Sequence, residues 1–193
     1  MIFIIRKTVS FTKTITTVLI FLFISIPLTL PHEFAHYYFR KRFGILTERI
    51  VLGNPNGKKI WSLKKVSFHY FGRNFIGGTV VPPNAERSNL PAYQQSLISF
   101  VGPLTDAFLS ISFLMLAQFG SMLSGLFLYY GLCSQLLSIS NMRKSSFDVT
   151  ESDGQKIYNI SKTHYSRAKI ILLILLLINI SVNGIIFWFR TTN

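Results

Sequence analysis

Two histidines and a glutamate lie close together in the first quarter of the chain, in the order His32-Glu33-Phe34-Ala35-His36. Residues four apart share one face of a helix, so both imidazoles can bind a single metal ion. Glu33 lies one position round that helix, where its carboxylate can take a proton from an attacking water molecule. The pattern therefore predicts a hydrolytic zinc site, with His32 and His36 as metal ligands and Glu33 as general base.

A catalytic zinc ion usually has three protein ligands and one open position. The chain contains only seven acidic residues, so few carboxylates are available. Asp106 is the only charged residue between Ser88 and Met142, and Asp153 follows that interval. The spacing alone leaves both aspartates open as the third ligand.

Charge and hydropathy place the chain among membrane proteins. Of its 193 residues 49% are hydrophobic and 14% charged, the net charge is +13 and the mean hydropathy is +0.40. An ordinary soluble domain has about 25% charged residues. High hydrophobicity excludes a disordered chain. Nucleic-acid-binding proteins usually carry their basic residues on a polar surface, and this largely apolar sequence does not fit that class. We therefore expect a small membrane protein with no nucleic-acid partner.

Long uncharged segments predict the membrane helices that must position the site. A spanning helix needs about 20 mostly apolar residues. We expect four spans, near residues 14–39, 94–119, 121–141 and 169–189, with a turn at Gly120. The predicted fold is mainly α, a single integral-membrane domain over residues 1–193 with about four transmembrane helices. Asn179 and Asn183 share one face of the last span and predict polar packing against another helix.

Basic residues assign an orientation to these spans. The loops 40–91 and 142–169 hold ten and six Lys or Arg, against four in the termini and the turn. Basic residues favour the cytoplasmic side. We therefore expect both loops in the cytoplasm, both termini outside and the metal motif near the cytoplasmic face.

Residues 46–83 predict a small cytoplasmic β-region associated with the membrane. Segments 48–53, 64–71 and 74–81 are rich in Val, Ile, Phe and Thr, and turn residues separate them. We expect short strands and a β-hairpin around residues 64–81.

Taken together, these motifs resemble those of the site-2 proteases, a family of intramembrane zinc metalloproteases. Residues 32–45 resemble the family's metal-binding helix, residues 76–80 the Gly-Gly stretch of its β-region, and residues 102–106 its G-P-x-x-N segment. Asn141, followed later by Asp153, resembles the N-x-x-P…D-G segment. The matches run in family order from residue 32 to about residue 157.

The resemblance implies a complete metal site. His32, His36 and Asp153 would hold Zn²⁺, and Glu33 would act as general base and then as proton donor to the leaving amine. The interval after Asn141 is longer than usual in the family, which leaves Asp148 open as another third ligand.

Four further residues are candidates for accessory or substrate-contacting roles: Asp106, Asn141, Gly77 and Gly78. Asp106 stands where the family usually has Asn, and Asn141 lacks the usual following Pro. For Asp106 two roles are open, orienting a substrate amide and making a helix-to-helix hydrogen bond. For the β-hairpin, strand addition to an extended substrate and covering the mouth of the site are both open.

The resemblance also implies a function. It is hydrolysis of a transmembrane protein substrate in regulated intramembrane proteolysis, by a multi-pass integral protein of the lipid bilayer, expected in a bacterial cell membrane. The alternative is a non-catalytic membrane protein whose degenerate metal site binds a metal or a partner. The departures at Asp106 and Asn141 support that alternative.

Overall fold

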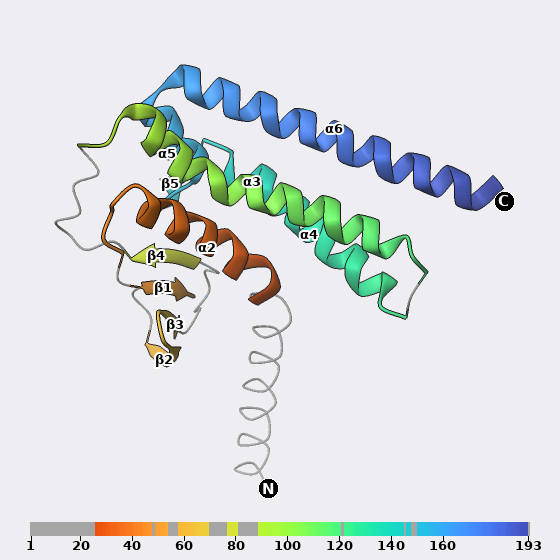
Figure 1. The fold of residues 1–193 in the computed structure, drawn as a ribbon, viewed down its shortest axis with the longest axis horizontal. Coiled ribbons are helices and arrows are strands. Elements are labelled where there is room, and N and C mark those ends of the chain that lie inside the picture. The colour runs from red at the N-terminus through yellow and green to blue at the C-terminus, as the bar shows by residue number, and fades with distance from the viewer. Residues whose placement is uncertain are drawn as a thin grey trace, which may run out of the picture.

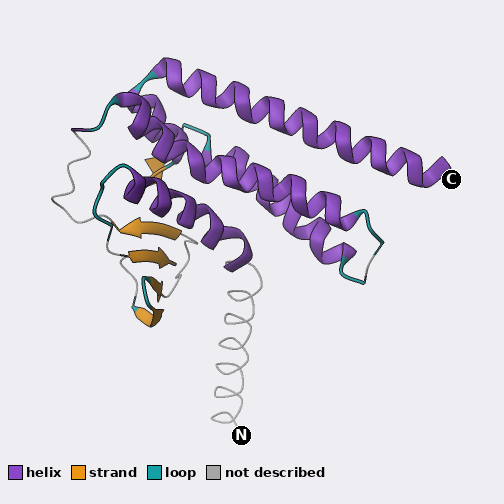
Figure 2. Ribbon diagram, viewed as in Figure 1, coloured by secondary structure: helices purple, strands orange, loops and turns teal. Residues whose placement is uncertain are grey.

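The structure, a computed structural model, describes residues 26–47, 49–53, 58–69, 77–80, 89–120, 122–144, 146–147 and 150–192. The described part is mainly helical, with a small β-sheet beside the helices (Figure 2). Residues 14–25 of the first expected span, Ile76 of the Gly-Gly stretch and Asp148 lie outside the described residues.

The described helices are α2 Ile26–Arg42, α3 Ala92–Ala117, α4 Ser124–Asn141, α5 Asp153–Ile160 and α6 Lys162–Thr192. Helices α3, α4 and α6 run side by side, and α2 lies between them and the sheet (Figure 1). The turn between α3 and α4 and the C-terminal end of α6 lie at one end of these helices, and α5 lies at the other. The helices therefore bring the middle of α2, part of α3 and the start of α5 together from distant parts of the chain.

Two of the described helices are long and apolar enough to cross a membrane, Ala92–Ala117 and Lys162–Arg190. Helices α3 and α4 occupy most of the expected segments 94–119 and 121–141, although α3 ends at Ala117 and α4 begins at Ser124. Gly120 between them has a φ of +66°, in the left-handed region that favours glycine. Helix α6 begins at Lys162, earlier than expected, because its first turns pack against α5. The count of four spans stays a prediction.

The sheet has four strands in the order β2-β3-β1-β4: β1 Arg49–Leu52, β2 Lys59–Leu63, β3 Val66–His69 and β4 Gly77–Val80. Strand β1 pairs parallel with β3 and antiparallel with β4, and β2 pairs antiparallel with β3. The hairpin expected around residues 64–81 is therefore wrong. The hairpin is β2–β3, with Lys64 at its turn (φ 50°), and β1 separates β3 from β4.

Burial explains why β1 takes a central position in the sheet. Val51 and Leu52 are 0% exposed, and such a strand is covered best with a neighbour on each side. Strand β2, which the sequence analysis missed, is exposed along its whole length at the edge. Ile50, Leu52 and Phe68 form a cluster against Leu30 and Tyr37 of α2, so the sheet is anchored to the helix that carries the two histidines.

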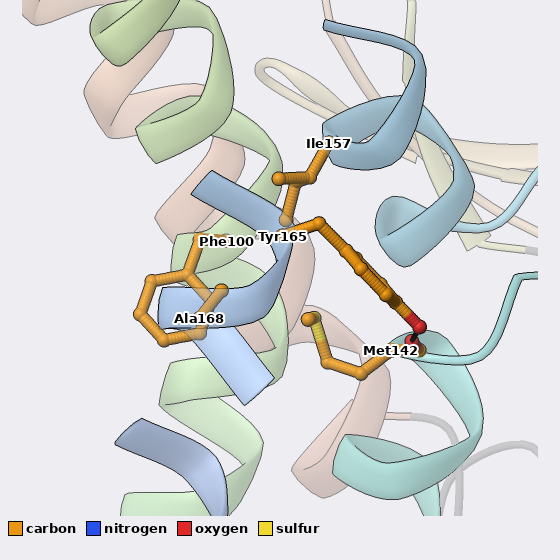
Figure 3. Close-up of a cluster of buried hydrophobic side chains, with 5 residues drawn as sticks. All are labelled: Phe100, Met142, Ile157, Tyr165 and Ala168. Atoms are coloured by element: carbon orange, nitrogen blue, oxygen red, sulfur yellow. Dashed lines mark hydrogen bonds between the residues drawn. The ribbon is translucent and has the colours of Figure 1, made fainter. Parts of the chain in front are cut away.

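A second apolar cluster fixes α5 at the end of the helices (Figure 3). Its members come from four parts of the chain: Phe100, Met142, Ile157, Tyr165 and Ala168. The Tyr165 hydroxyl donates a hydrogen bond to the Met142 carbonyl (3.1 Å). The cluster joins α3, the end of α4, α5 and the start of α6, and so fixes the helix that begins at Asp153. A two-stranded sheet of β5 Ser146–Phe147 and β6 Thr150–Glu151 precedes α5.

Polar side chains join the three long helices, as the asparagine pair predicted. The Asn179 amide of α6 donates to Ser110 Oγ of α3 (3.1 Å) and to Gln135 Oε1 of α4 (2.9 Å). Ser110 Oγ also donates to Gln135 Oε1 (2.9 Å), and Asn183 Nδ2 donates to Asn179 Oδ1 (2.7 Å). The expected polar packing against another helix is confirmed for Asn179, whereas Asn183 donates to Asn179 within α6.

Candidate metal centre

Helix α2 presents the two histidines on its buried face. Every fourth residue of this face is buried: Leu28, His32, His36 and Arg40. Phe34 and Tyr38 on the other side are 55% and 54% exposed. Because residues four apart lie above one another on a helix, both imidazoles point inwards, where α2 packs on α3.

Helix α3 meets these imidazoles with a matching row of residues four apart, Ile98, Gly102 and Asp106. A Cβ atom at Gly102 would lie 2.3 Å from His36 Nε2 and 2.6 Å from His32 Nε2. A glycine is therefore required here, because the α3 backbone lies directly against both rings.

The third candidate ligand stands at the first position of α5. Ser152 is the N-cap, and its Oγ accepts from the Gln155 backbone N–H (3.1 Å), so the helix begins at Asp153. A carboxylate in the first turn of a helix is favourable. A Cβ atom at Gly154 would lie 2.3 Å from the Met142 carbonyl oxygen, so glycine lets α5 lie against the chain beyond α4.

Three ligand atoms converge between these helices. His32 Nε2 lies 3.1 Å from His36 Nε2, and Asp153 Oδ2 lies 3.3 Å from the first nitrogen and 3.2 Å from the second. All three side chains are buried. Zinc bonds of about 2.0–2.1 Å in a tetrahedral site place neighbouring ligand atoms about 3.3 Å apart. The separations observed here fit such a set of three ligands.

Hydrogen bonds to the other ring nitrogens define which atoms carry lone pairs. His36 Nδ1 bonds the Ile98 carbonyl oxygen (2.6 Å), and His32 Nδ1 bonds Asp106 Oδ2 (2.8 Å). A carbonyl oxygen only accepts hydrogen bonds, so the neutral His36 ring carries its proton on Nδ1. An ionised carboxylate also only accepts, so the neutral His32 ring likewise carries its proton on Nδ1. In these neutral tautomers each Nε2 atom carries a lone pair that a metal ion can accept, whereas a ring protonated at Nε2 can donate a hydrogen bond to Asp153 Oδ2. The arrangement therefore suits a metal ion held between the two Nε2 atoms and the Asp153 carboxylate.

Asp153 is held in its ionised form. Burial raises the pKa of its carboxyl group. The neighbouring His36 and Lys156 and the hydrogen bonds from both imidazoles lower this pKa by a larger amount, so it lies well below the usual range. Lys156 Nζ lies 3.0 Å from Asp153 Oδ1. One carboxylate oxygen is thus paired with the lysine, and the other faces the imidazoles.

The remaining predicted site residues lie around this centre. Glu33 is buried beside His32 on α2. Asn141, the last residue of α4, donates from Nδ2 to Asp106 Oδ2 (3.4 Å). Gly77 and Gly78 lie on strand β4, paired with Leu52 and Val51, and are not part of the ligand cluster.

The structure therefore brings His32, His36 and Asp153 together and places Asp106 differently. Asp106 faces Nδ1 of His32, on the side of the ring away from the ligand atoms, so its geometry is not that of the third ligand. Sequence reasoning missed the contacts of Ile98 and Lys156. Their spacing carries a signal, since Ile98 lies two helical steps of four before Asp106, and Lys156 lies three residues after Asp153.

A buried cluster of two histidines and a carboxylate, built on an H-E-x-x-H helix, is the ligand set of a zinc peptidase. The sequence model of Peptidase family M50 matches residues 17–186. The chain therefore belongs to this family, the site-2 protease family, whose members are membrane zinc metalloproteases. A search of the curated proteins gives no match to the chain.

Proposed function

We propose that this protein is an intramembrane zinc endopeptidase that hydrolyses peptide bonds of membrane-anchored proteins in regulated intramembrane proteolysis. The observation that carries the proposal is the convergence of His32 Nε2, His36 Nε2 and Asp153 Oδ2 within 3.1–3.3 Å of one another. Glu33 follows the first of these ligands directly in the sequence, as a general base for peptide hydrolysis does in an H-E-x-x-H helix.

The mechanism assigns a step to each of these side chains. His32, His36 and Asp153 would hold Zn²⁺, which when bound supplies Lewis-acid activation of water and of the substrate carbonyl. As the water oxygen bonds to the carbonyl carbon, the Glu33 carboxylate accepts the proton that the water loses. When the C–N bond breaks, Glu33 returns this proton to the amine nitrogen, and the products are an amine and a carboxylic acid, which then ionises by releasing its own proton to solvent.

Substrate positioning is the proposed role of the sheet. A helical substrate has its amide groups already hydrogen-bonded, so the bond to be cleaved must first be unwound. Strand β4 is an edge of the described sheet and packs against α2, which makes it the edge close to the metal helix. We assign strand addition of the unwound segment to this edge, with Gly77 and Gly78 on the receiving strand. Covering the mouth of the site is the alternative role.

The proposed topology has four spans, with loops 40–91 and 142–169 in the cytoplasm, both termini outside and a bacterial cell membrane as the location. Family membership and the two long apolar helices support a membrane location. The position of the α3–α4 turn and the C-terminus at one end of the helices, opposite α5, supports the assignment of sides (Figure 1).

The proposal is tested by Glu33→Gln in cells that also express candidate single-span proteins. The variant should fold and bind zinc like wild type, because the three ligand side chains are unchanged, and should lose cleavage by about 10²–10⁴-fold. Accumulation of the cleaved product is measured on an immunoblot. Glu151→Gln, the same change at an exposed glutamate, is the matched control and should cleave normally. Normal cleavage by Glu33→Gln would refute the mechanism.

A second candidate is a non-catalytic metal- or partner-binding protein, which the departures at Asp106 and Asn141 favour. Metal analysis of purified wild-type protein, together with the cleavage test, separates the two. Near-stoichiometric zinc with cleavage that depends on Glu33 supports the peptidase. Absence of zinc, or zinc without cleavage of any co-expressed substrate, supports the second candidate.

A further inference from the structure

Asp106 is a buried carboxylate to which the proposed hydrolysis assigns no step. Its side chain is 1% exposed in the middle of α3. Oδ2 accepts from His32 Nδ1 (2.8 Å) and Asn141 Nδ2 (3.4 Å). Oδ1 is buried and has no hydrogen-bond partner among the described residues. A half-satisfied charge at membrane depth is costly, so its presence requires a compensating interaction.

Comparison with asparagine indicates what the charge adds. Asparagine would present one accepting oxygen to His32 Nδ1 without burying a negative charge. The carboxylate differs from the amide in its full charge, which interacts through the His32 ring with a cation on the Nε2 side. A cation at that position therefore offsets part of the energetic cost of burying Asp106.

We propose that Asp106 is a positioning residue of the metal centre, whose carboxylate holds His32 as the Nδ1–H tautomer, directs Nε2 to the metal and strengthens zinc binding. The proposal rests on the zinc site of the proposed function. A carboxylate on the outer nitrogen of a ligand histidine makes the ring more basic and fixes its orientation. Asn141, which donates to the same Oδ2, holds the carboxylate in place.

The second histidine provides an internal contrast. His36 Nδ1 bonds a backbone carbonyl, that of Ile98 (2.6 Å), which no substitution removes. His32 is therefore the ligand whose outer partner is a side chain and can be changed by mutation. A change at Asp106 should affect one ligand of the three and leave the other two in place.

The test measures zinc affinity by competition with a chromogenic chelator in detergent-purified wild type, Asp106→Asn and Asp106→Ala. Asp106→Asn keeps an acceptor for His32 Nδ1 and loses the charge, so we expect about a 10-fold weaker zinc affinity. Asp106→Ala loses both, and we expect about a 100-fold weaker affinity. The visible spectrum of the Co²⁺-substituted protein should shift in Asp106→Ala, because the His32 ring is no longer held.

Ser138→Ala is the matched control for helix packing. Ser138 Oγ donates to the Pro103 carbonyl (2.8 Å), so this variant also loses a buried hydrogen bond between α3 and α4, and that bond involves no histidine. It should bind zinc like wild type. The proposal is overturned if Asp106→Ala binds zinc like wild type or if Ser138→Ala weakens binding equally. Should Asp106→Ala not fold, Asp106→Asn decides, and an unchanged affinity overturns the role of the charge.

The outcomes for the two proposals are distinct. A wild-type protein that binds no zinc overturns both the peptidase and the role of Asp106. A wild-type protein that binds zinc and cleaves its substrate, with unchanged zinc affinity in both Asp106 variants, overturns the role of Asp106 alone.

Discussion

At the scale of single residues, the metal centre depends on a glycine as directly as on its ligands. Gly102 places the backbone of α3 where a side chain would otherwise meet both imidazoles. The same close approach lets Ile98 and Asp106, one helical step to either side, reach the Nδ1 atoms of His36 and His32. The orientation of both histidine ligands therefore depends on Gly102, a residue that has no side chain to bind metal or transfer a proton.

Gly102→Ala is predicted to weaken zinc binding by at least about 10-fold, an effect typical of losing the groups that orient a ligand. Alanine ordinarily stabilises a helix by about 1 kcal/mol relative to glycine, but here its Cβ would lie 2.3 Å from His36 Nε2, so the rings must move. Zinc affinity and the melting temperature measure the effect. Gly184→Ala on α6, where nothing lies within 4 Å of the new atom, should bind zinc normally. Equal behaviour of the two variants would contradict the prediction.

At the scale of secondary-structure elements, α6 is attached at two places that have different chemistry. Its first turns join the apolar cluster through Tyr165 and Ala168. Farther along, where most of its surface is apolar and exposed, Asn179 bonds both α3 and α4. Apolar contacts alone give little preference for helix association in lipid, so a buried polar contact sets where α6 lies.

Asn179→Ala is predicted to lower the free energy of unfolding by about 1–2 kcal/mol. Hydrogen bonds between membrane helices contribute about 0.6 kcal/mol each, and Asn179 makes two, to Ser110 and Gln135. Denaturation in mixed detergent measures the change. Zinc affinity should not change, because the ligands lie on α2 and α5. Ser181→Ala, at an exposed position of α6, is the control, and unfolding of Asn179→Ala at the same denaturant concentration as this control would refute the prediction.

At the scale of the whole molecule, the centre connects parts of the chain that are far apart in sequence. His36 and Asp153 are 117 residues apart, and His32 and Asp106 are 74 residues apart. A metal ion bound by these residues holds α2 to α5, and α3 supports both rings. Metal binding should therefore stabilise the tertiary fold as well as supply chemistry.

Zinc is predicted to raise the melting temperature at neutral pH, and this stabilisation should disappear as the pH falls. Zinc at 100 times its dissociation constant stabilises a folded protein by about 2.7 kcal/mol. Protons compete for the imidazole Nε2 atoms, so the affinity should fall by up to about 10-fold per pH unit for each ring that becomes protonated.

Asp153 does not limit zinc binding in this range, because its pKa lies well below the usual range and the carboxylate is already ionised. Thermal unfolding with zinc and with a chelator, at several pH values, measures the effect. A zinc-dependent shift that is equal at pH 5 and pH 7.5 would contradict the assignment of the imidazoles as ligands.

The sequence by itself determined the local features of this protein. His32, Glu33 and His36 are predictable because a spacing of four on a helix fixes which side chains share a face. Uncharged runs marked α3, α4 and α6, and β-branched residues marked β1, β3 and β4. Each of these signals lies within one continuous segment of the sequence, where backbone geometry alone relates the side chains.

Only the tertiary structure decided the long-range pairings. It placed Asp153 with the two histidines, turned Asp106 to the outer nitrogen of His32, and set β1 between β3 and β4. Sequence spacing cannot distinguish one distant carboxylate from another, because the distance between them depends on how every intervening element packs. The apolar cluster around Ile157 fixes the position of α5, and the close approach at Gly102 fixes α3 against α2; together these contacts determine which carboxylate faces which nitrogen.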